Sequence, residues 1–329
     1  MRARGRQKGV ALITVLLVFA LAAIIASDVA SRNFRDIRKT SNFINSKQAY
    51  HFALAGEQFA RQILYRDFVA EKDLRVDTLR DSWADIAETF DIEEGVMTIE
   101  ITDAQSKFNL NNLIDEAGQV RSSSLNTLRQ LLSLLRVDES VAMRLVDWQD
   151  RNQIALKGGA EDEIYQQLGY LTANQPIVDR TELRLLHELS VSDYNTLKDH
   201  VVALPLSVGD KKTSPTKYNL NTLDAKIIES ILTSANGGSA SSTSTSSGDI
   251  SRIIARQKAG GYDSLPKWSA NGYIDSSSIT GSRFSVSSEF FEILVKVKYD
   301  QRISVIRTQV YRDSSDGKIT LLKRQQGIE

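Results

Sequence analysis

The sequence has no cysteine among its 329 residues and only three histidines. The absence of cysteine excludes disulfide bonds, thiolate nucleophiles and cysteine-ligated zinc. His51, His187 and His200 lie far apart in the sequence, which leaves little material for a catalytic imidazole or a zinc site. We interpret each of them as a surface or half-buried residue without a chemical role.

Net charge is absent as well, because Lys and Arg together number 41 and Asp and Glu together number 41. A neutral chain gives no electrostatic reason to expect a nucleic-acid or other polyanionic partner. A charged fraction of 25% beside 41% hydrophobic residues is ordinary for a globular protein. The length allows two domains, since a domain usually has about 100–200 residues.

The first thirty residues have the clearest pattern in the chain. Arg2, Arg4, Arg6 and Lys8 precede a run without charge, residues 10–26. As a helix, this run would span about 26 Å, which is close to the thickness of the hydrocarbon core of a bilayer. We therefore predict a single transmembrane helix, with its basic flank on the cytoplasmic side.

Two other interpretations of this amino terminus compete. A secretory signal peptide also has a basic start and an apolar run, and Ala22, Ala23 and Ala26 could supply its cleavage site. The second alternative is an uncleaved signal anchor. The residues that follow favour a longer helix, because no glycine or proline occurs between the apolar run and Gly56 and apolar residues recur at helical spacing. We predict one helix from residue 10 to about residue 66.

The remainder of the chain has both strand and helix patterns. Residues 95–102 alternate between polar and apolar side chains, which is typical of a strand. Strand patterns return only near the carboxyl terminus, where Asp316-Gly317 predicts a hairpin turn between strands at 303–311 and 319–322, next to another at 290–299. Helical patterns occur at 77–90, 122–135, 140–148, 181–189 and 194–200. We predict an α+β chain whose sheet is interrupted by a large helical insert.

A partial repeat lies inside the predicted insert. The motif Phe108-Asn109-Leu110-Asn111 recurs as Tyr218-Asn219-Leu220-Asn221, and a helical pattern follows each copy. Asparagine before an apolar periodic run is a helix-capping signal, so we predict a structural role for both motifs. Residues 234–248 are rich in Ser, Gly and Thr, which predicts a flexible loop without chemistry.

One stretch of the insert has the composition of a cation site. Asp147, Asp150 and Asn152 are followed by a glycine-containing segment with Glu161 and Asp162. Oxygen ligands concentrated in such a loop suit calcium, which takes about six to eight oxygens at about 2.3–2.6 Å. The spacing is not that of an EF-hand. The alternative is a solvated loop in which these acids cap helices or pair with nearby arginines.

No pattern in the sequence indicates catalysis. The glycine pairs of the chain lack the flanking strand, helix and lysine of a phosphate-binding loop. No serine stands in a nucleophile-elbow pattern, and carboxylates adjacent in sequence do not form an acid/base pair across a substrate. We expect Trp148 and Tyr165 to pack in the core of the insert, and we predict a protein that is not an enzyme.

The junction Gln7-Lys8-Gly9-Val10 resembles the processing site of type IV prepilins and pseudopilins. The resemblance implies that a prepilin peptidase cuts after Gly9, methylates the new amine of Val10 and leaves the apolar helix in place. Most such chains have a glutamate five residues into the mature protein, where this sequence has Thr14. In the family, that carboxylate is thought to neutralise the terminal amine of a neighbouring subunit, because an unpaired charge among apolar helices is costly.

The chain as a whole resembles the K-type minor pseudopilins of bacterial type II secretion. The features that carry the resemblance are the leader, Thr14 in place of glutamate, both asparagine motifs, the acidic loop and the terminal strands. It implies a pseudopilin fold, a long amino-terminal helix plus an antiparallel sheet, with a large inserted all-α domain similar to SAM and helix-hairpin-helix folds. The implied parts are a leader, a transmembrane helix, a helix with a first strand, the insert and the last strands, at residues 1–9, 10–26, 27–104, 105–286 and 287–329.

The resemblance also implies a structural calcium site. K-type chains have a Trp-x-Asp-x-Asp run and a Gly-Ala-Glu segment, and Asp150, Asn152, Glu161 and Asp162 stand at the matching positions of this sequence. Asn152 replaces an aspartate and can ligate through its amide oxygen without adding charge. We do not extend the predicted ligand set to Asp147.

By the same resemblance, the chain is expected at the tip of the type II secretion pseudopilus, where it would nucleate or cap assembly for protein export across the outer membrane. Its implied partners are the I-type and J-type minor pseudopilins, then the H type, the major pseudopilin, the prepilin peptidase and the inner-membrane assembly platform, with no nucleic acid. It would cross the inner membrane once, with its amino terminus cytoplasmic before processing and the bulk of the chain periplasmic.

Two other functions remain open at this point. A minor type IV pilin or a competence pseudopilin would share the leader, but such chains usually lack an insert of this size and often have a disulfide. A membrane-anchored helix-hairpin-helix protein that binds DNA would need a basic Gly-x-Gly hairpin to contact phosphates. Neither asparagine motif of this sequence has that hairpin.

Overall fold

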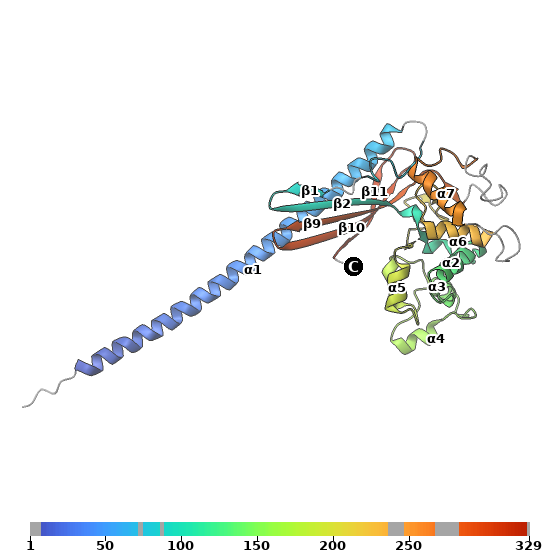
Figure 1. Ribbon diagram of the computed structural model, residues 1–329. Coiled ribbons are helices and arrows are strands. Elements are labelled where there is room, and N and C mark those ends of the chain that lie inside the picture. Colours follow the sequence, from blue (N-terminus) through green and yellow to red (C-terminus); the bar gives the residue numbers. More distant parts are fainter. Residues whose placement is uncertain (1–7, 72–74, 86–88, 236–246, 267–282, 328–329) are drawn as a thin grey trace, which may run out of the picture.

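The computed structural model, which describes residues 8–71, 75–85, 89–235, 247–266 and 283–327, is dominated by one long helix, α1 (Lys8–Ala70). The first half of α1 extends alone, whereas its second half lies along a sheet (Figure 1). Side chains from Val10 to Ile44 are exposed, and the first fully buried residue is Ala49. The predicted long helix is therefore confirmed. Within the described residues, α1 alone is long and apolar enough to cross a membrane.

The sheet beside α1 has five strands in the order β1-β2-β9-β10-β11, and every neighbouring pair is antiparallel. Its central pair joins β2 to β9, which are far apart in the sequence, with Ile99 opposite Val295. The strands are β1 (Thr89–Ile92), β2 (Gly95–Asp103), β9 (Phe290–Tyr299), β10 (Arg302–Arg312) and β11 (Ile319–Gln326). A pseudopilin-like body of one long helix on an antiparallel sheet is thus confirmed.

Small residues on α1 allow the helix to approach the sheet closely. Ala49, Ala53, Gly56 and Ala60 recur at helical spacing on the face of α1 that lies on the sheet, and the three alanines are fully buried. A Cβ atom on Gly56 would lie 2.7 Å from the Met97 sulfur, which is closer than packed atoms allow. This face of α1 therefore requires small side chains.

The predicted hairpin before the last strand is present. The chain turns at Asp316-Gly317 between β10 and β11, and Gly317 has a φ of 72°, a backbone conformation that favours glycine. A Cβ atom at Gly317 would also collide with the ring of Phe68 on α1. The turn between β10 and β11 therefore packs closely against the end of α1.

The insert between β2 and β9 has its own hydrophobic core, separate from the core between α1 and the sheet. It lies at the end of the sheet opposite the free half of α1 (Figure 1). Its α-helices are α2 (Ser122–Leu134), α3 (Ser140–Gln149), α4 (Asp162–Tyr165), α5 (Val191–Leu197), α6 (Ala225–Ala235) and α7 (Ser247–Lys258). Single 3₁₀ turns are η1 (Ala104–Ser106), η2 (Leu110–Asn112) and η3 (Gln166–Leu168), and a longer one is η4 (Arg180–Leu185).

Short strands tie the helices of the insert together, a feature that the sequence did not indicate. β3 (Phe108–Asn109) pairs in parallel with β4 (Val201–Val202), and β7 (Tyr218–Asn219) pairs in parallel with β8 (Phe284–Ser285). A small antiparallel pair joins β5 (Ser207–Val208) to β6 (Lys211–Lys212). The two parallel pairs each begin at an asparagine motif.

Several local predictions need correction. The helix expected at 77–90 is wrong, because residues 75–85 form turns and Thr89–Ile92 is strand β1. The Asp81 carboxylate accepts hydrogen bonds from the backbone and the hydroxyl of Thr78, which stabilises a turn instead of a helix. The helix expected at 181–189 is the shorter η4, which starts at a capping box. Most of the loop expected at 234–248 lies outside the described residues, between α6 and α7.

A third, small apolar cluster joins the insert to the sheet. Ala104 and Phe290 stand where the chain leaves β2 and where it enters β9, and they pack with Val202, Leu204 and Tyr311. Around this cluster, Lys107 and Arg180 of the insert face the carboxylate of Glu292 on β9, at 3.4 Å and 3.6 Å. The insert is therefore held against the sheet by both apolar and charged contacts.

Candidate assembly helix and acidic site

The free half of α1 is an apolar surface without cover. Residues 10–26 contain no charge, and their side chains are exposed along the whole run. Apolar side chains also continue beyond this run, at Val29, Phe34, Ile37, Phe43 and Ile44. A single helix that exposes so much apolar surface in water is unfavourable, so lipid or neighbouring helices must cover it.

Thr14 lies near the start of this free half. Its hydroxyl donates a 2.9 Å hydrogen bond to the carbonyl oxygen of Ala11, three residues earlier on the same helix. The polar group is therefore satisfied within α1 and carries no charge for a neighbouring subunit. Gly9 and Val10 belong to the first turn of α1, and residues 1–7 lie outside the described residues, so the processing site stays a prediction.

One buried ion pair anchors the second half of α1 to the edge of the sheet. The fully buried carboxylate of Glu57 accepts hydrogen bonds from Arg324 Nε and Nη2, at 2.6 Å and 2.7 Å, and from the Thr308 hydroxyl at 2.9 Å. Burial alone would raise the pKa of Glu57, but the hydrogen bonds and charge of Arg324 bring it below its ordinary value. The ionised pair fixes the position of α1 across β10 and β11.

The acidic site of the insert is formed where α3 ends and α4 begins. Carboxylate oxygens of Asp147, Asp150 and Glu161 all lie within 4.8 Å of one another, and all three residues are buried. Asp147 is in the last turn of α3, Asp150 is its C-cap, and Glu161 is the N-cap of α4. Two helix ends therefore bring three negative charges together in a shielded position.

Glu161 is the most exceptional of these residues. It is 5% exposed, and neither of its carboxylate oxygens has a hydrogen-bond partner in the described structure. Burial, and then the charges of Asp147 and Asp150, raise the pKa of Glu161 to about 7. Burial is also the main cause that raises the pKa of Asp147 to about 6. Buried carboxylate oxygens without a partner are costly, so the site favours a proton or a cation.

A glycine makes room for this arrangement. A Cβ atom on Gly159 would collide with the carboxylate of Asp147, and the neighbouring Gly158 has a φ of 86°. The loop between α3 and α4 can therefore pass beside Asp147 only because glycine stands there. The Asp147 carboxylate accepts a 3.1 Å hydrogen bond from the backbone of Leu156 in the same loop.

Of the four predicted calcium ligands, the structure places two in the acidic site, Asp150 and Glu161, and two outside it, Asn152 and Asp162. Asp150 and Glu161 are together, and Asp147, which the prediction left out, completes the group. Its position could have been inferred from the helical spacing of Asp147 and Asp150, which places both on one face of α3. Asp162 lies outside the group, and its Oδ1 accepts hydrogen bonds from the backbone and the hydroxyl of Thr172, at 2.9 Å and 2.6 Å.

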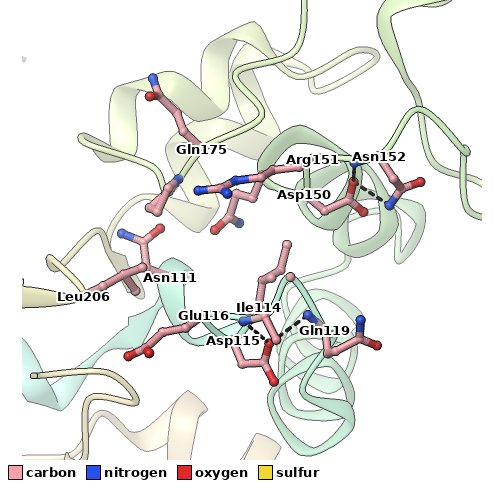
Figure 2. A pocket seen from close by; sticks show the side chains of 14 residues that line it. Asn111, Ile114, Asp115, Glu116, Gln119, Asp150, Arg151, Asn152, Gln175 and Leu206 are labelled. Atoms are coloured by element: carbon pink, nitrogen blue, oxygen red, sulfur yellow. Dashed lines mark hydrogen bonds between the residues drawn. The ribbon is translucent and has the colours of Figure 1, made fainter.

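Asn152 supports the group from one side. Its Nδ2 donates a 2.8 Å hydrogen bond to Asp150 Oδ1, and its amide oxygen accepts one from the backbone of Ile154. Figure 2 shows the Asn152 side chain turned toward Asp150. Asn152 thus orients an acidic residue of the site, while its own oxygen is occupied by backbone.

A cavity of about 300 Å³ with both polar and apolar lining adjoins the acidic site, and Asp150 lines it (Figure 2). Asp115 on the opposite wall is held by hydrogen bonds from the backbone of Ala117 and Gln119. Among the other lining residues are Asn111, Arg151 and Gln175. The carboxylates that line it are those of Asp115, Glu116 and Asp150.

The aromatic residues near the site have a packing role, as predicted. Trp148 and Tyr165 are buried, and their ring centroids are 5.2 Å apart in an edge-to-face arrangement that Tyr170 extends. They form part of the core of the insert.

Comparison with known proteins identifies relatives of the whole chain. The family model for Type II secretion system (T2SS), protein K, matches residues 106–206. Type II secretion system protein K of Pseudomonas aeruginosa is 30% identical over 335 residues, which cover 98% of this chain and 94% of the relative. The protein of the same name from Klebsiella pneumoniae is 36% identical over 60% of this chain and 63% of its own length. The protein of that name from Pectobacterium carotovorum is 27% identical and covers 98% of both chains.

A solved structure shares the fold. It is the crystal structure of the GspK-GspI-GspJ complex from the enterotoxigenic Escherichia coli Type 2 Secretion System. One of its chains matches with a TM-score of 0.65 and 22% identity, and the match covers 88% of this chain and 100% of that chain. Together with the full-length relatives, the long helix on an antiparallel sheet and the helical insert show that this chain belongs to the type II secretion system protein K family of minor pseudopilins.

Proposed function

We propose that this chain is the tip subunit of the type II secretion pseudopilus, where it starts or caps the fibre and acts without catalysis. The observation that carries the proposal is Thr14, whose hydroxyl is bonded to its own helix and which offers no carboxylate to a subunit above it. A subunit at the end of a fibre needs no such acceptor. The insert supports the same position, because it adds bulk at the end of the sheet opposite the free half of α1 (Figure 1).

The anchor in this proposal is the apolar start of α1. Residues 10–26 would cross the inner membrane once, and the sheet and insert would lie in the periplasm. Cleavage after Gly9 by a prepilin peptidase would leave a methylated Val10 at the new terminus. Mass spectrometry of the mature membrane-bound chain tests this step. A start at methylated Val10 is expected, whereas an intact Met1 or a start near Ser27 contradicts it.

The partners would be other minor pseudopilins. The related chain of known structure is in a complex with GspI and GspJ, so we propose the I-type and J-type subunits as direct partners. The H type, the major pseudopilin and the inner-membrane assembly platform would follow in the fibre. Co-expression of the full-length chain with the I-type and J-type subunits should give a stable complex in detergent. Failure of the three chains to co-purify would count against the proposal.

Thr14 gives the sharpest test of the tip position. The variant Thr14→Glu would supply the missing acceptor and bury a charge when no subunit sits above it. We expect this variant to assemble less efficiently as the tip, with secretion reduced several-fold, while the conservative Thr14→Ser variant behaves like the wild type. Equal secretion by all three chains would show that the residue does not mark the end of the fibre.

We further propose that the acidic site holds a structural calcium ion. Asp147, Asp150 and Glu161 supply hard oxygen ligands, and Glu161 has two buried oxygens without a partner. An ion there would connect the ends of α3 and α4 and offset three buried charges. Calcium is expected to raise the melting temperature of the full-length chain in detergent, and magnesium, which needs a tighter octahedral site, should act less. No shift with calcium would remove the proposal.

A further inference from the structure

A second group of buried charges lies where α1, the sheet and the insert meet. Arg312, at the end of β10, is 4% exposed, and its guanidinium contacts the carboxylates of Asp67 at the end of α1 and of Asp77 in the turn segment 75–85. The distance from Arg312 Nη1 to Asp67 Oδ2 is 3.3 Å. Carboxylate oxygens of Asp67, Asp77 and Asp81 all lie within 4.8 Å of one another.

The charges in this group do not balance. Glu71, one turn after Asp67, is close enough that the other three carboxylates act on its charge, and Arg312 is the cation that acts on it in turn. Among the described residues, Asp67, Asp77 and Asp81, with Glu71 near them, therefore share one guanidinium, which contacts two of them. Asp77 is fully buried, and Asp81 and Glu71 are half-buried. The guanidinium of Arg75 lies 4.6 Å from the centroid of the Phe68 ring, and the guanidinium of Arg312 approaches the same ring at 5.9 Å. Like charges at this distance disfavour ionisation of Asp67, Glu71 and Asp77, and burial adds to that cost.

The group is connected to the insert through Ser288 and Asn219. The backbone of Ser288 donates a 2.7 Å hydrogen bond to Asp77, and its carbonyl accepts one from Arg312 at 3.0 Å. Asn219, in the second asparagine motif, donates to the carbonyl of Asp77 and to the carboxylate of Asp103, both at 3.1 Å. Asp103 is the last residue of β2 and is itself buried. The same contacts thus hold the end of α1, the sheet and the second half of the insert.

We propose that this junction is a proton-binding joint, in which the four carboxyl groups around Arg312 keep at least one proton near neutral pH and lose it in mildly alkaline solution. Loss of the proton adds a negative charge beside Arg312, the one cation of the described residues that acts on Glu71. Repulsion then weakens the hold of the turn segment 75–85 on Arg312, and with it the attachment of the insert. Acidification has the opposite effect and tightens the joint. The tip subunit would in this way respond to the pH of its compartment.

The pKa values agree with this geometry in direction. Burial, and then the charges of Asp81 and Asp77, raise the pKa of Asp67 to about 6. Burial, followed by the charges of Asp77, Asp67 and Asp81, raises the pKa of Glu71 to about 8. A carboxyl group whose pKa is raised by folding adds stability that is complete below its unfolded pKa and is lost as the pH rises through the folded pKa. The loss is therefore expected between about pH 5 and pH 8.

The test is thermal unfolding of the full-length chain in detergent at several pH values, with EDTA present so that the acidic site between α3 and α4 binds no ion. We expect the wild type to melt at a lower temperature at about pH 8.5 than at about pH 6. In Glu71→Gln, which cannot ionise, the difference should fall to about half. Asp81→Asn, which removes one neighbouring charge, should reduce the difference in melting temperature less than Glu71→Gln does. The matched control Asp210→Asn, at an exposed turn of the insert, should keep the wild-type slope.

Hydrogen exchange supplies a second, local measurement. Peptides that cover residues 75–85 should lose protection from pH 6 to pH 8.5 beyond the intrinsic change in exchange rate, and Glu71→Gln should suppress that loss. The proposal is overturned if Glu71→Gln and Asp81→Asn keep the full wild-type slope, if Asp210→Asn flattens it equally, or if the melting temperature rises with pH. These outcomes do not depend on whether the chain occupies the tip of a fibre.

Discussion

The two halves of the insert are built on one framework, but in the part of the chain that the structure describes, the acidic site lies in the first half. The first half (108–204) and the second half (218–286) each begin with an aromatic-Asn-Leu-Asn motif whose first two residues pair with a short parallel strand, β4 or β8. Gln149 at the end of α3 and Gln257 in α7 donate to matching leucine carbonyls, Leu110 and Leu220, at 3.4 Å and 2.8 Å.

The second asparagine of each motif repeats the same bonds. Asn111 donates to the carbonyl of Ile177 at 2.8 Å and accepts from its backbone N–H at 2.8 Å. Asn221 does the same with Tyr262, at 2.9 Å and 2.6 Å. A buried amide with a donor and an acceptor can clamp a remote backbone segment, which neither an apolar side chain nor a carboxylate can do.

The two halves differ in the charges placed on this framework. When the two halves are aligned in sequence so that Gln149 matches Gln257, Asp147 and Asp150 stand opposite Ala255 and Lys258. The second half has no counterpart of the three-carboxylate group among the described residues. The comparison teaches that the same asparagine and glutamine bonds form in the second half without three carboxylates among its described residues, so the acidic site is an addition to the framework.

The largest expected effect comes from breaking the framework in either half. Asn111→Ala and Asn221→Ala should each lower the free energy of unfolding by about 3 kcal/mol, because each leaves buried backbone groups without a partner. Chemical denaturation of the full-length chain in detergent measures both. Similar losses would confirm that the two motifs contribute equally to the free energy of unfolding. A loss below about 1 kcal/mol at either position would show that the same hydrogen bonds contribute less to stability in that half of the insert.

The next effect should separate the two halves. Calcium at a hundredfold excess over its dissociation constant is expected to stabilise the wild type by about 2.7 kcal/mol. Glu161→Gln should remove this gain and, without calcium, should leave the chain as stable as the wild type or more so, since a buried unpaired charge is gone. Asp249 in the second half, a half-buried acid paired with Arg252, gives a control, Asp249→Asn, which should respond to calcium like the wild type.

Retention of the full calcium response by Glu161→Gln would show that the ion binds elsewhere. Loss of the calcium response in Asp249→Asn would indicate that the second half takes part in ion binding. Calcium binding would then not distinguish the two halves of the insert.

A smaller effect concerns glycine. Gly261 in the second half has a φ of 71°, and a Cβ atom there would lie 2.5 Å from the amide oxygen of Asn221. Gly118 in the first half has a similar φ of 78° but open space around it. Gly118→Ala should therefore cost about 1 kcal/mol from backbone strain alone, and Gly261→Ala about 2 kcal/mol because it also displaces the asparagine. Equal costs would mean that Asn221 can move without loss.

The sequence could predict the periodic parts of this fold and not its joints. The long α1, the strands β2, β9, β10 and β11 and the Asp316-Gly317 turn depend on local patterns and were predicted correctly. The segment 75–85 was not, because Asp81 stabilises a local turn at Thr78 and Asp77 is held by Arg312, which is far away in the sequence. In the acidic site, Asp150 and Glu161 were predicted, but Asp147 was not, although its helical spacing to Asp150 was available in the sequence.

The smallest expected effect is a pH dependence that belongs to the first half and disappears with calcium. Burial raises the pKa of Asp147 to about 6 and that of Glu161 to about 7, so these groups add stability below about pH 4 that is lost as the pH rises through those values. Bound calcium displaces the protons and should abolish this part of the slope. The slope that the Arg312 junction produces should persist with calcium, because no residue of that junction belongs to the acidic site.

Melting temperatures of the wild type and Glu161→Gln across this pH range, each with calcium and with EDTA, separate the two contributions. The wild-type slope should be steeper with EDTA than with calcium, and Glu161→Gln should have the same shallow slope in both. If calcium leaves the wild-type slope unchanged, the carboxylates that titrate are not those that bind the ion, and the first half would differ from the second only in composition.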